Sequence, residues 1–479
     1  MEQPANPGPG YDAPLCVDLD GTLLKSDLLL ESVLVLLAHN PLYAFALPWW
    51  LLRGKAALKR EISSRVELDP RHLPYDERVV AQLRDATGRT RVLCTASDVR
   101  LAQAVSEHLG VFDVVLASDG ETNLSGARKA EVLASRFGER GFDYVGNDKV
   151  DLPVWRRARR AWVVNAPSRL AERAAAECEV AGHLPLQGRS VRAWIRAVRM
   201  HQWLKNLLVF LPLLASHRLL EIPAVIDSTL AFLAFGLCAS GVYLLNDLLD
   251  LAADRQHPRK RLRPFASGAL PLLHGMAVAP LLTLSGLALA LLVGPAFMGV
   301  LLAYYCMTLA YSLRLKRVVM VDVVLLAGLY TVRIIGGAVA LGSVLSFWLL
   351  AFSMFLFLSL AMLKRYAELS VMLADGRTQA SGRGYSVEDL PLLQSLGGSS
   401  GYLAVLVLAL YINSPESLAL YHRPQILWLL CPILLYWVSR VWVVAHRGDM
   451  NDDPVVFAVT DRTSQALLAV SGVVVASAI

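Results

Sequence analysis

The sequence has 479 residues with a net charge of +6, and only 18% of its residues are charged. Soluble domains carry roughly 25% charged residues, so this composition, with 55% hydrophobic residues, argues against a wholly soluble protein. Charge density is ordinary in residues 1–200, whereas long apolar runs dominate residues 203–479. We therefore expect a soluble domain over residues 1–185 and a membrane domain over residues 186–479, with a boundary near Leu184–Ser190.

The N-terminal segment and the cysteines bear on the cellular compartment. Met1–Tyr11 is polar and shows no signal-peptide pattern, so we expect the domain that follows it to stay in the cytoplasm. The six cysteines show no CxxC spacing, which predicts free thiols with neither a zinc site nor a disulfide framework.

The first chemical motif is a short apolar run, Leu15–Leu19, that carries Asp18 and continues to Asp20, Gly21 and Thr22. This pattern predicts a strand that ends in two carboxylates. A carboxylate at a strand end can attack phosphorus, and a second one two residues later can act as acid and base.

The motif Asp18–Thr22 resembles the first motif of the haloacid dehalogenase (HAD) superfamily, and three later segments match in order: Arg91–Thr95, Gly126–Lys129 and Tyr144–Asp148, followed by Asp151. The resemblance covers residues 12–166 and implies a Rossmann-like α/β domain. It implies that Asp18 is the nucleophile, that Asp20 is the acid and base, and that Thr95 and Lys129 hold the phosphoryl group.

The resemblance also implies a Mg²⁺ site made of Asp18, Asp20, Asn147 and Asp151. The family has an aspartate where this sequence has Asn147, so one ligand lacks its charge, and Asp148 or Asp151 would compensate. The alternative to a phosphatase is a regulatory or inactive domain.

An apolar insert follows the first motif, near residues 28–52. Its stretch Leu28–Trp50 is interrupted by His39, Asn40 and Pro41, which is unlike a membrane span. We expect a helical cap that rests on the membrane surface or on the other domain. Packing inside a small cap is the alternative.

The second half predicts an all-α polytopic membrane domain, because spans of about 20 apolar residues recur. About nine transmembrane helices are expected: Trp203–Ala215, Val225–Leu245, Leu272–Val293, Ala296–Leu313, Val318–Leu341, Val344–Leu363, Tyr402–Ile412, Ile426–Val444 and Ala466–Ile479.

The loops between these spans predict the orientation. With the N-terminus inside, the inner loops are rich in Lys and Arg, whereas the outer loops offer only Arg218 and Arg423. This bias follows the positive-inside rule and predicts an integral protein of a bacterial-type inner membrane, with its soluble domain and charged motifs in the cytoplasm.

An acidic motif stands at the end of the second expected span and consists of Asn246, Asp247, Asp250 and Asp254. Spacings of three and four residues place the carboxylates on one helical face, and ionisable groups there are costly and usually functional. Oxygen ligands of this kind suit Mg²⁺. A basic group follows at once (Arg259, Lys260, Arg261 and Arg263), so we expect a Mg²⁺–diphosphate site. The alternative is a solvated acidic helix end.

This motif resembles the first signature of the UbiA superfamily of membrane prenyltransferases, over residues 195–479. The usual members bind a prenyl diphosphate through two acidic motifs. The matching second segment here, Lys364–Leu369, contains one acid, Glu368, and two cations, Lys364 and Arg365.

The chain resembles more closely the decaprenyl-phosphate phosphoribosyltransferase branch, through His201–Asn206, Asn246–Pro264, Tyr311–Ser312, Leu315–Lys316, Asp322, Arg333, Lys364–Glu368 and Asp453–Phe457. The resemblance implies transfer of 5-phosphoribose from phosphoribosyl diphosphate to a polyprenyl phosphate. The soluble domain would then remove the 5-phosphate.

Roles follow from this resemblance. The three aspartates of the acidic motif would hold Mg²⁺ and diphosphate with Asn246 orienting them, and Lys205, Lys260 and Arg263 would neutralise phosphate charge. The sugar site would be lined by Tyr311, Lys316 and Asp322. The acceptor phosphate would meet Arg333, Lys364 and Arg365, with Glu368 as a further substrate-binding residue.

The expected partners are these two substrates and the membrane, with no nucleic acid, and the sequence is compatible with a homo-oligomer. The first alternative is an aromatic prenyltransferase that uses a prenyl diphosphate. The second is a transporter or lipid-binding protein, which would leave the acidic motif unexplained.

Overall fold

The computed structural model describes residues 13–119, 121–186, 191–374, 376, 384–450 and 453–479. The segment Met1–Tyr11 and the boundary residues Gly188 and Ser190 lie outside the described residues. The chain divides into two units. The first contains the chain up to Val198 together with Tyr243–Val278, and the second contains Arg199–Val242 and Ala279–Ile479.

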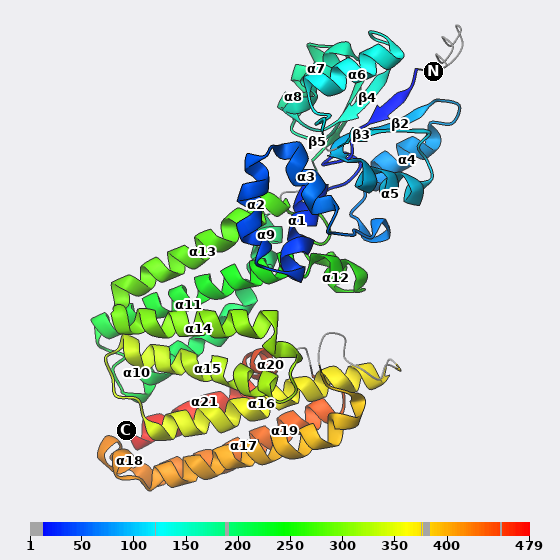
Figure 1. The fold of residues 1–479 in the computed structure, drawn as a ribbon. Helices are drawn as coiled ribbons and strands as arrows, with labels where there is room; N and C mark the ends of the chain where they lie inside the picture. Colours follow the sequence, from blue (N-terminus) through cyan, green and yellow to red (C-terminus); the bar gives the residue numbers. More distant parts are fainter. Residues whose placement is uncertain (1–12, 120, 187–190, 375, 377–383, 451–452) are drawn as a thin grey trace. The chain divides into compact units, whose positions relative to one another are not determined.

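A sheet of six parallel strands forms the centre of the first unit, in the order β3-β2-β1-β4-β5-β6 (Figure 1). The strands are β1 (Leu15–Val17), β2 (Arg91–Asp98), β3 (Val114–Ser118), β4 (Asp143–Gly146), β5 (Arg160–Ala166) and β6 (Glu179–Pro185). The predicted α/β architecture of this region is therefore confirmed.

Alternation of side chains along β1 separates two apolar cores. Cys16 packs with α6 (Ala127–Phe137), α7 (Leu152–Arg157) and α8 (Ser168–Ala175) on one face of the sheet. Leu15 and Val17 pack on the other face with α4 (Glu77–Asp85) and α5 (Val99–Leu109). Successive side chains of a strand point to opposite faces, so the three residues of β1 are buried from both sides.

Three helices fill the insert between β1 and α4: α1 (Leu28–His39), α2 (Tyr43–Leu52) and α3 (Lys55–Ser63). Asp27 caps α1 by accepting hydrogen bonds from the N–H groups of Leu29 and Leu30. The prediction of a helical insert is confirmed. The first unit also contains α9 (Val191–Ala197), α12 (Leu251–Gln256) and the short 3₁₀ helices η1 (Pro70–His72), η2 (Lys149–Asp151) and η4 (Lys260–Leu262).

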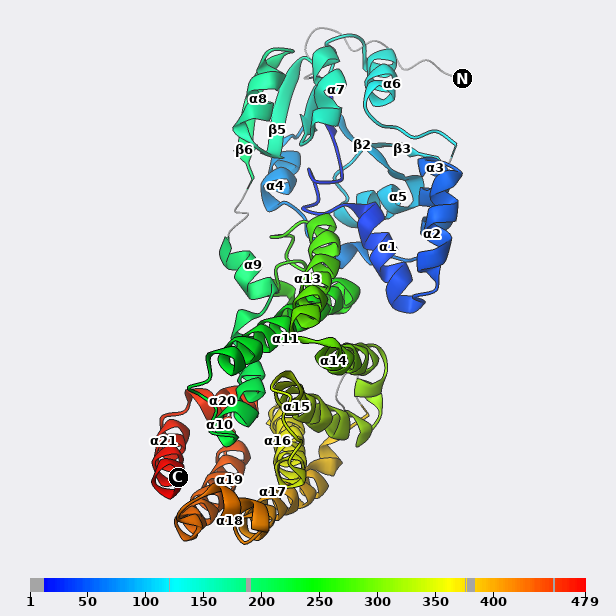
Figure 2. The same cartoon turned by 90° about the vertical axis from the view of Figure 1, so that its left-hand side faces the viewer.

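The second unit is helical. Its elements include η3 (Met200–Phe210), α10 (Leu211–Ala215), α14 (Pro295–Leu313), η5 (Leu315–Arg317), α15 (Val321–Ala340), α16 (Phe347–Ala374), η6 (Val387–Asp389), α17 (Leu390–Ile412), α18 (Pro415–Leu420), η7 (Pro424–Leu429), α19 (Leu430–His446), α20 (Pro454–Thr460) and α21 (Arg462–Ala478). Two long helices, α11 (Ile222–Leu249) and α13 (Leu272–Val293), run through both units. Helices α15, α16 and α17 pack side by side (Figure 2).

Seven helices among the described residues are long and apolar enough to cross a membrane. They are Ile222–Leu249, Leu272–Val293, Pro295–Leu313, Val321–Ala340, Phe347–Ala374, Val387–Ile412 and Pro424–His446. The polytopic architecture is confirmed, but the described residues contain fewer such helices than the nine or so expected. The two other expected spans are short: Trp203–Ala215 divides between η3 and α10, and Ala466–Ile479 falls in the 17-residue helix α21.

Helix α17 begins twelve residues before the expected span Tyr402–Ile412 because its glycines pack instead of breaking the helix. A Cβ atom added to Gly397 would lie 2.3 Å from the Trp442 ring, and one on Gly401 would lie 2.5 Å from Val438. Small residues at contacts between membrane helices let the backbones approach closely. Hydropathy alone does not detect such a segment.

Candidate active sites

The first candidate site lies at the carboxyl ends of β1, β2 and β4, which meet at one edge of the parallel sheet. Asp18 follows β1, and its N–H donates to the carbonyl of Val145. Lys129 of α6 is buried and donates from Nζ to Asp18 Oδ1 and to the Tyr144 hydroxyl, each at 2.9 Å. Burial opposes the charge of Lys129, but Asp18 and Asp151 hold its pKa above the ordinary value. A permanent cation therefore stands beside the predicted nucleophile.

Asp20 is held by two donors. Its Oδ1 accepts from the N–H of Leu28 at 2.8 Å, and its Oδ2 accepts from the Ser97 hydroxyl at 2.6 Å. Burial, with the charges of Asp27 and Asp18, raises the pKa of Asp20 to about 7. A carboxyl group that is protonated near neutral pH is suited to give a proton to a leaving group.

Asn147 follows β4 and lies against the first motif. Its Oδ1 accepts a hydrogen bond from the Thr22 hydroxyl at 3.3 Å. Gly21 has a φ of +73°, and a Cβ atom at Gly21 would lie 2.1 Å from Asn147 Nδ2. The glycine is therefore required both by its backbone conformation and by the close approach of Asn147.

Asp151 and Thr95 are both buried and both engaged. Asp151 Oδ1 accepts from the Tyr144 hydroxyl, and its Oδ2 accepts from the N–H groups of Asn147 and Asp148. The Thr95 hydroxyl accepts from the N–H of Ser97 at 3.0 Å. Burial, together with the charge of Asp18, raises the pKa of Asp151 to about 6. Asp151 therefore orders the loop that carries Asn147.

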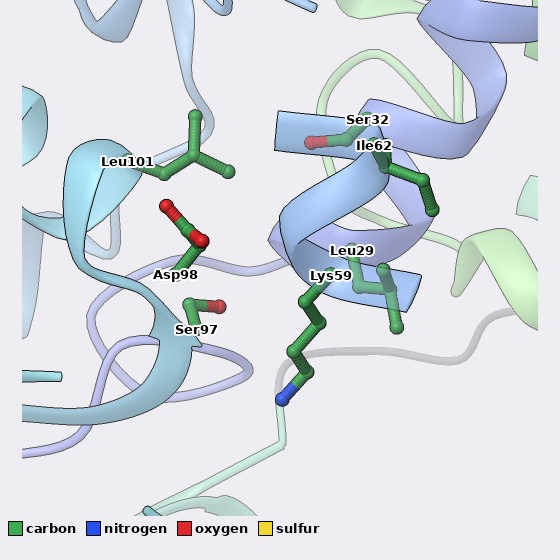
Figure 3. Close-up of a pocket in the computed structure, with 7 residues that line it drawn as sticks. All are labelled: Leu29, Ser32, Lys59, Ile62, Ser97, Asp98 and Leu101. Atoms are coloured by element: carbon green, nitrogen blue, oxygen red, sulfur yellow. The ribbon is translucent and has the colours of Figure 1, made fainter. Parts of the chain in front are cut away.

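A pocket opens between the insert and this edge of the sheet (Figure 3). Ser97, Asp98 and Leu101 face the α1 and α3 residues across it. Lys59 of α3 donates from Nζ to the Ala96 carbonyl and to Asn123 Oδ1. The pocket adjoins Asp20, because Ser97 contacts that carboxylate, and its lining consists of Leu29, Ser32, Lys59, Ile62, Ser97, Asp98 and Leu101.

The second candidate site is the acidic motif, also in the first unit. Helix α11 ends at Leu249 and α12 begins at Leu251, but the N–H groups of Asp250 and Asp254 bond to carbonyls four residues earlier, so the helical register continues. Asp247 and Asp254 are buried and share the guanidinium of Arg263, at 3.1 and 2.6 Å. Burial raises the pKa of Asp254, and the charge of Arg263 opposes this rise.

The motif therefore gathers two carboxylates around one cation. Asn246 and Asp250 are half-buried beside them, and Lys260 is exposed on η4. Among the residues that the structure describes, no group of three His, Cys, Asp or Glu side chains has the spacing of a metal site. Two buried carboxylates that converge on a cation nevertheless have the chemistry that Mg²⁺ prefers.

The third candidate site, which we call the basic cluster, lies in the second unit and consists of Lys205, Arg333, Lys364 and Asp453. Asp453 Oδ2 accepts from both lysines, at 2.5 Å from Lys205 and 3.1 Å from Lys364. Lys205 and Arg333 both lie 5.8 Å from the Tyr330 ring centroid. Arg333 is buried in α15 and donates to Asn206, to the Tyr304 hydroxyl and to the Leu329 carbonyl.

Arg365 belongs to a separate network. It donates to Asp322 at 2.6 Å, to Glu368 at 2.5 Å and to the Tyr311 hydroxyl at 2.8 Å. Asp322 also accepts from the Tyr385 hydroxyl. The prediction grouped Arg365 with the cations for an acceptor phosphate, but two carboxylates compensate its charge here. Lys316 is half-buried on η5.

Sequence reasoning missed several residues of these sites. Asp453 was noticed only as part of a matching stretch, although an aspartate before a proline is a common helix start, and it caps α20. Asn206 was likewise noticed only as part of a matching stretch. Tyr304 and Tyr385 carried no local signal, because their partners lie far away along the chain.

Comparisons with known proteins agree with the membrane architecture. Residues 209–460 match the model of the UbiA prenyltransferase family. The uncharacterized protein y4nM of Sinorhizobium fredii is 38% identical over 94% of this chain and 88% of its own length. The nodulation protein NoeC of Azorhizobium caulinodans is 38% identical over 57% of this chain and 88% of its own length.

A third relative is named decaprenyl-phosphate phosphoribosyltransferase. This protein of Mycolicibacterium smegmatis is 30% identical over 58% of this chain and 89% of its own length. The family match covers more than half of the chain, and the seven apolar helices agree with it. The chain therefore belongs to the UbiA prenyltransferase family and is an integral membrane transferase.

Proposed function

We propose that the membrane domain transfers 5-phosphoribose from phosphoribosyl diphosphate to a polyprenyl phosphate, and that the N-terminal domain then removes the 5-phosphate. The first step is supported by the relative named decaprenyl-phosphate phosphoribosyltransferase. The second is supported by the arrangement of Asp18, Asp20 and Lys129, which suits phosphoryl transfer.

The proposal that the acceptor is a phosphate rests on the basic cluster. Lys205 and Lys364 share a single carboxylate, Asp453, and the Arg333 guanidinium donates to the neutral groups of Asn206, Tyr304 and Leu329. Lys205 and Arg333 are buried and lie beside the same Tyr330 ring. Buried charge is costly unless it is paired, so such an excess of positive charge favours a bound anion. A phosphate monoester supplies that anion, whereas an uncharged acceptor would leave the excess uncompensated.

We assign the binding site of the donor, phosphoribosyl diphosphate, to the acidic motif. Asp247, Asp250 and Asp254 would hold Mg²⁺, which neutralises the leaving diphosphate when it is bound. An oxygen of the acceptor phosphate forms the new bond to the anomeric carbon of the ribose, and the bond from that carbon to the diphosphate oxygen breaks. Arg263 and Lys260 provide cations for the phosphate oxygens.

An aromatic prenyltransferase remains the alternative, and the network around Arg365 weighs against it. A second metal site would need a second acidic motif, and the matching segment Lys364–Leu369 has one acid, Glu368, beside two cations. Asp322 and Glu368 both bind the buried Arg365. This pairing supports a positioning role for the two acids.

A donor assay tests the first step. Purified protein with Mg²⁺ and a polyprenyl phosphate should incorporate label from phosphoribosyl diphosphate and not from a prenyl diphosphate. Lys364→Gln should raise the KM for the acceptor and leave the KM for the donor unchanged, whereas Arg447→Gln, an exposed cation of the same unit, should change neither. Incorporation from a prenyl diphosphate alone would refute the proposal.

For the second step, Asp18 attacks the 5-phosphate, and the bond from phosphorus to the ribose oxygen breaks as Asp20 gives that oxygen a proton. Water then attacks the aspartyl phosphate, with Asp20 taking a proton, and phosphate leaves. Asp18→Asn should leave transfer intact and accumulate the 5-phosphorylated lipid. If wild type and Asp18→Asn give the same phosphorylated lipid, the N-terminal domain has a regulatory role.

A further inference from the structure

Helix α2 has two apolar faces, and only one of them is used inside the first unit. Trp50 is buried, and the inner face packs against α1 and α3 in a core that includes Val33, Leu36 and Ile62. The residues of this inner face follow the spacing of one helical side and are Tyr43, Ala46, Leu47 and Trp50.

The outer face is exposed and equally apolar. Leu42 is 69% exposed, Phe45 83%, Trp49 65% and Leu52 82%. Steps of three, four and three residues place these side chains on one side of the helix. Soluble proteins rarely expose contiguous apolar patches of this kind, and a helix that is apolar all round is normally covered on every side.

The chain itself indicates what covers this face. The first unit contains Tyr243–Leu249 and Leu272–Val278, which are the end of α11 and the beginning of α13. Both helices are candidate membrane spans, so the unit is joined covalently to two segments that enter a bilayer. A bilayer therefore lies next to the points where the chain of this unit continues into the spans of α11 and α13.

The charges in and next to α2 also indicate that lipid covers its outer face. Helix α2 contains no acidic residue, and the exposed cations Arg53 and Lys55 follow it directly. Helices that lie in the interface of a bilayer combine an apolar face with basic residues that meet anionic headgroups.

We propose that the outer face of α2 inserts into the interface of the membrane in which the chain is embedded. Phe45, Trp49 and Leu52 enter the boundary between headgroups and acyl chains, and Arg53 and Lys55 bind anionic headgroups. This docking holds the insert, and with it the Asp20 site, against lipid. It rests on the membrane character of the chain and not on the proposed phosphatase activity.

A fluorescent reporter on α2 tests the docking in the full chain. NBD would be attached at Phe45→Cys in a Cys306→Ser/Cys431→Ser background, because Cys306 is exposed and Cys431 is half-buried. Glu107→Cys on α5, also an exposed helical position, is the matched control. In vesicles of phosphatidylcholine and phosphatidylglycerol, the emission at position 45 should shift to the blue and be lost with doxyl-labelled lipids. The control should show neither change.

Equal quenching at positions 45 and 107 would overturn the proposal. So would a blue shift at position 45 without lipid quenching, particularly with energy transfer between labelled chains, because a second copy would then cover the face. In the double variant Arg53→Gln/Lys55→Gln, the quenching of the label at position 45 by doxyl-labelled lipids should fall. Unchanged quenching would refute the role of anionic headgroups. Neither outcome depends on hydrolysis at Asp18.

Discussion

Asp20 is half-buried and Asp151 is buried, both near Asp18, and their hydrogen-bond partners differ. Asp20 accepts from one N–H and one hydroxyl, and its pKa rises to about 7. Asp151 accepts from a hydroxyl and two N–H groups that order the loop after β4. We therefore expect Asp20 to act as the acid and Asp151 to position the loop.

The raised pKa of Asp20 predicts a pH dependence. The protonated form gives the proton to the leaving ribose oxygen, so hydrolysis of a 5-phosphoribosyl substrate should fall as the pH rises through about 7. With p-nitrophenyl phosphate, whose leaving group needs no proton, the decline should be much weaker. Initial rates from pH 5 to 9 measure this difference, and identical declines for both substrates would assign the titration to another group.

The acidic motif predicts a loss of transfer when one carboxylate is neutralised. Asp250→Asn and Asp254→Asn should each abolish transfer, because removal of a metal carboxylate should cost several kcal/mol of transition-state stabilisation. Single-turnover assays with labelled phosphoribosyl diphosphate provide the measurement. Asp85→Asn, at an exposed helix end, is the control and should behave as wild type. Normal transfer by either motif variant would show that the donor binds elsewhere.

At the scale of elements, helix α1 connects two candidate sites of the first unit. Its first N–H, from Leu28, bonds to Asp20. One turn later, Glu31 forms a buried bidentate pair with Arg255, at 2.6 and 2.8 Å. Arg255 follows Asp254 directly in α12, so α1 contacts both Asp20 and the helix that carries Asp254.

This pair predicts a large effect from single substitutions. Glu31→Gln or Arg255→Gln would leave one buried charge without its partner, which typically costs about 3–5 kcal/mol. Thermal unfolding of the full chain in detergent should show a lower transition temperature for each variant. The exchange Glu31→Arg/Arg255→Glu should recover part of the loss. If neither single variant is less stable, the pair does not fix α1 to α12.

At the scale of the whole molecule, the distribution of charge predicts the topology. Lys260 lies in a basic loop between α12 and α13, whereas Glu416 lies in α18 between two candidate spans. The positive-inside rule places the first in the cytoplasm and the second outside. In intact cells an impermeant thiol reagent should label Glu416→Cys and should label Lys260→Cys only after permeabilisation. Labelling of position 260 from outside would overturn the topology.

The sequence by itself determined the coarse architecture and indicated the candidate reactive groups. Long apolar runs specify membrane helices because the bilayer requires them, and the run before Asp18 specifies a buried strand. Asp247, Asp250 and Asp254 were found because helical spacing is local. The insert was recognised as helical for the same reason. All of these features depend on residues that are close together in the chain.

Only the tertiary structure decided which charges are paired. Lys205 and Asp453 are 248 residues apart, and Glu31 and Arg255 are 224 apart. Arg365 and Lys364 are neighbours in the sequence and both are cations. Two carboxylates compensate the charge of Arg365, whereas Lys364 shares one carboxylate with Lys205. Such long-range pairs decide how many positive charges at a buried site have no compensating carboxylate. They matter there because burial removes water as the alternative partner. No local pattern contains that information.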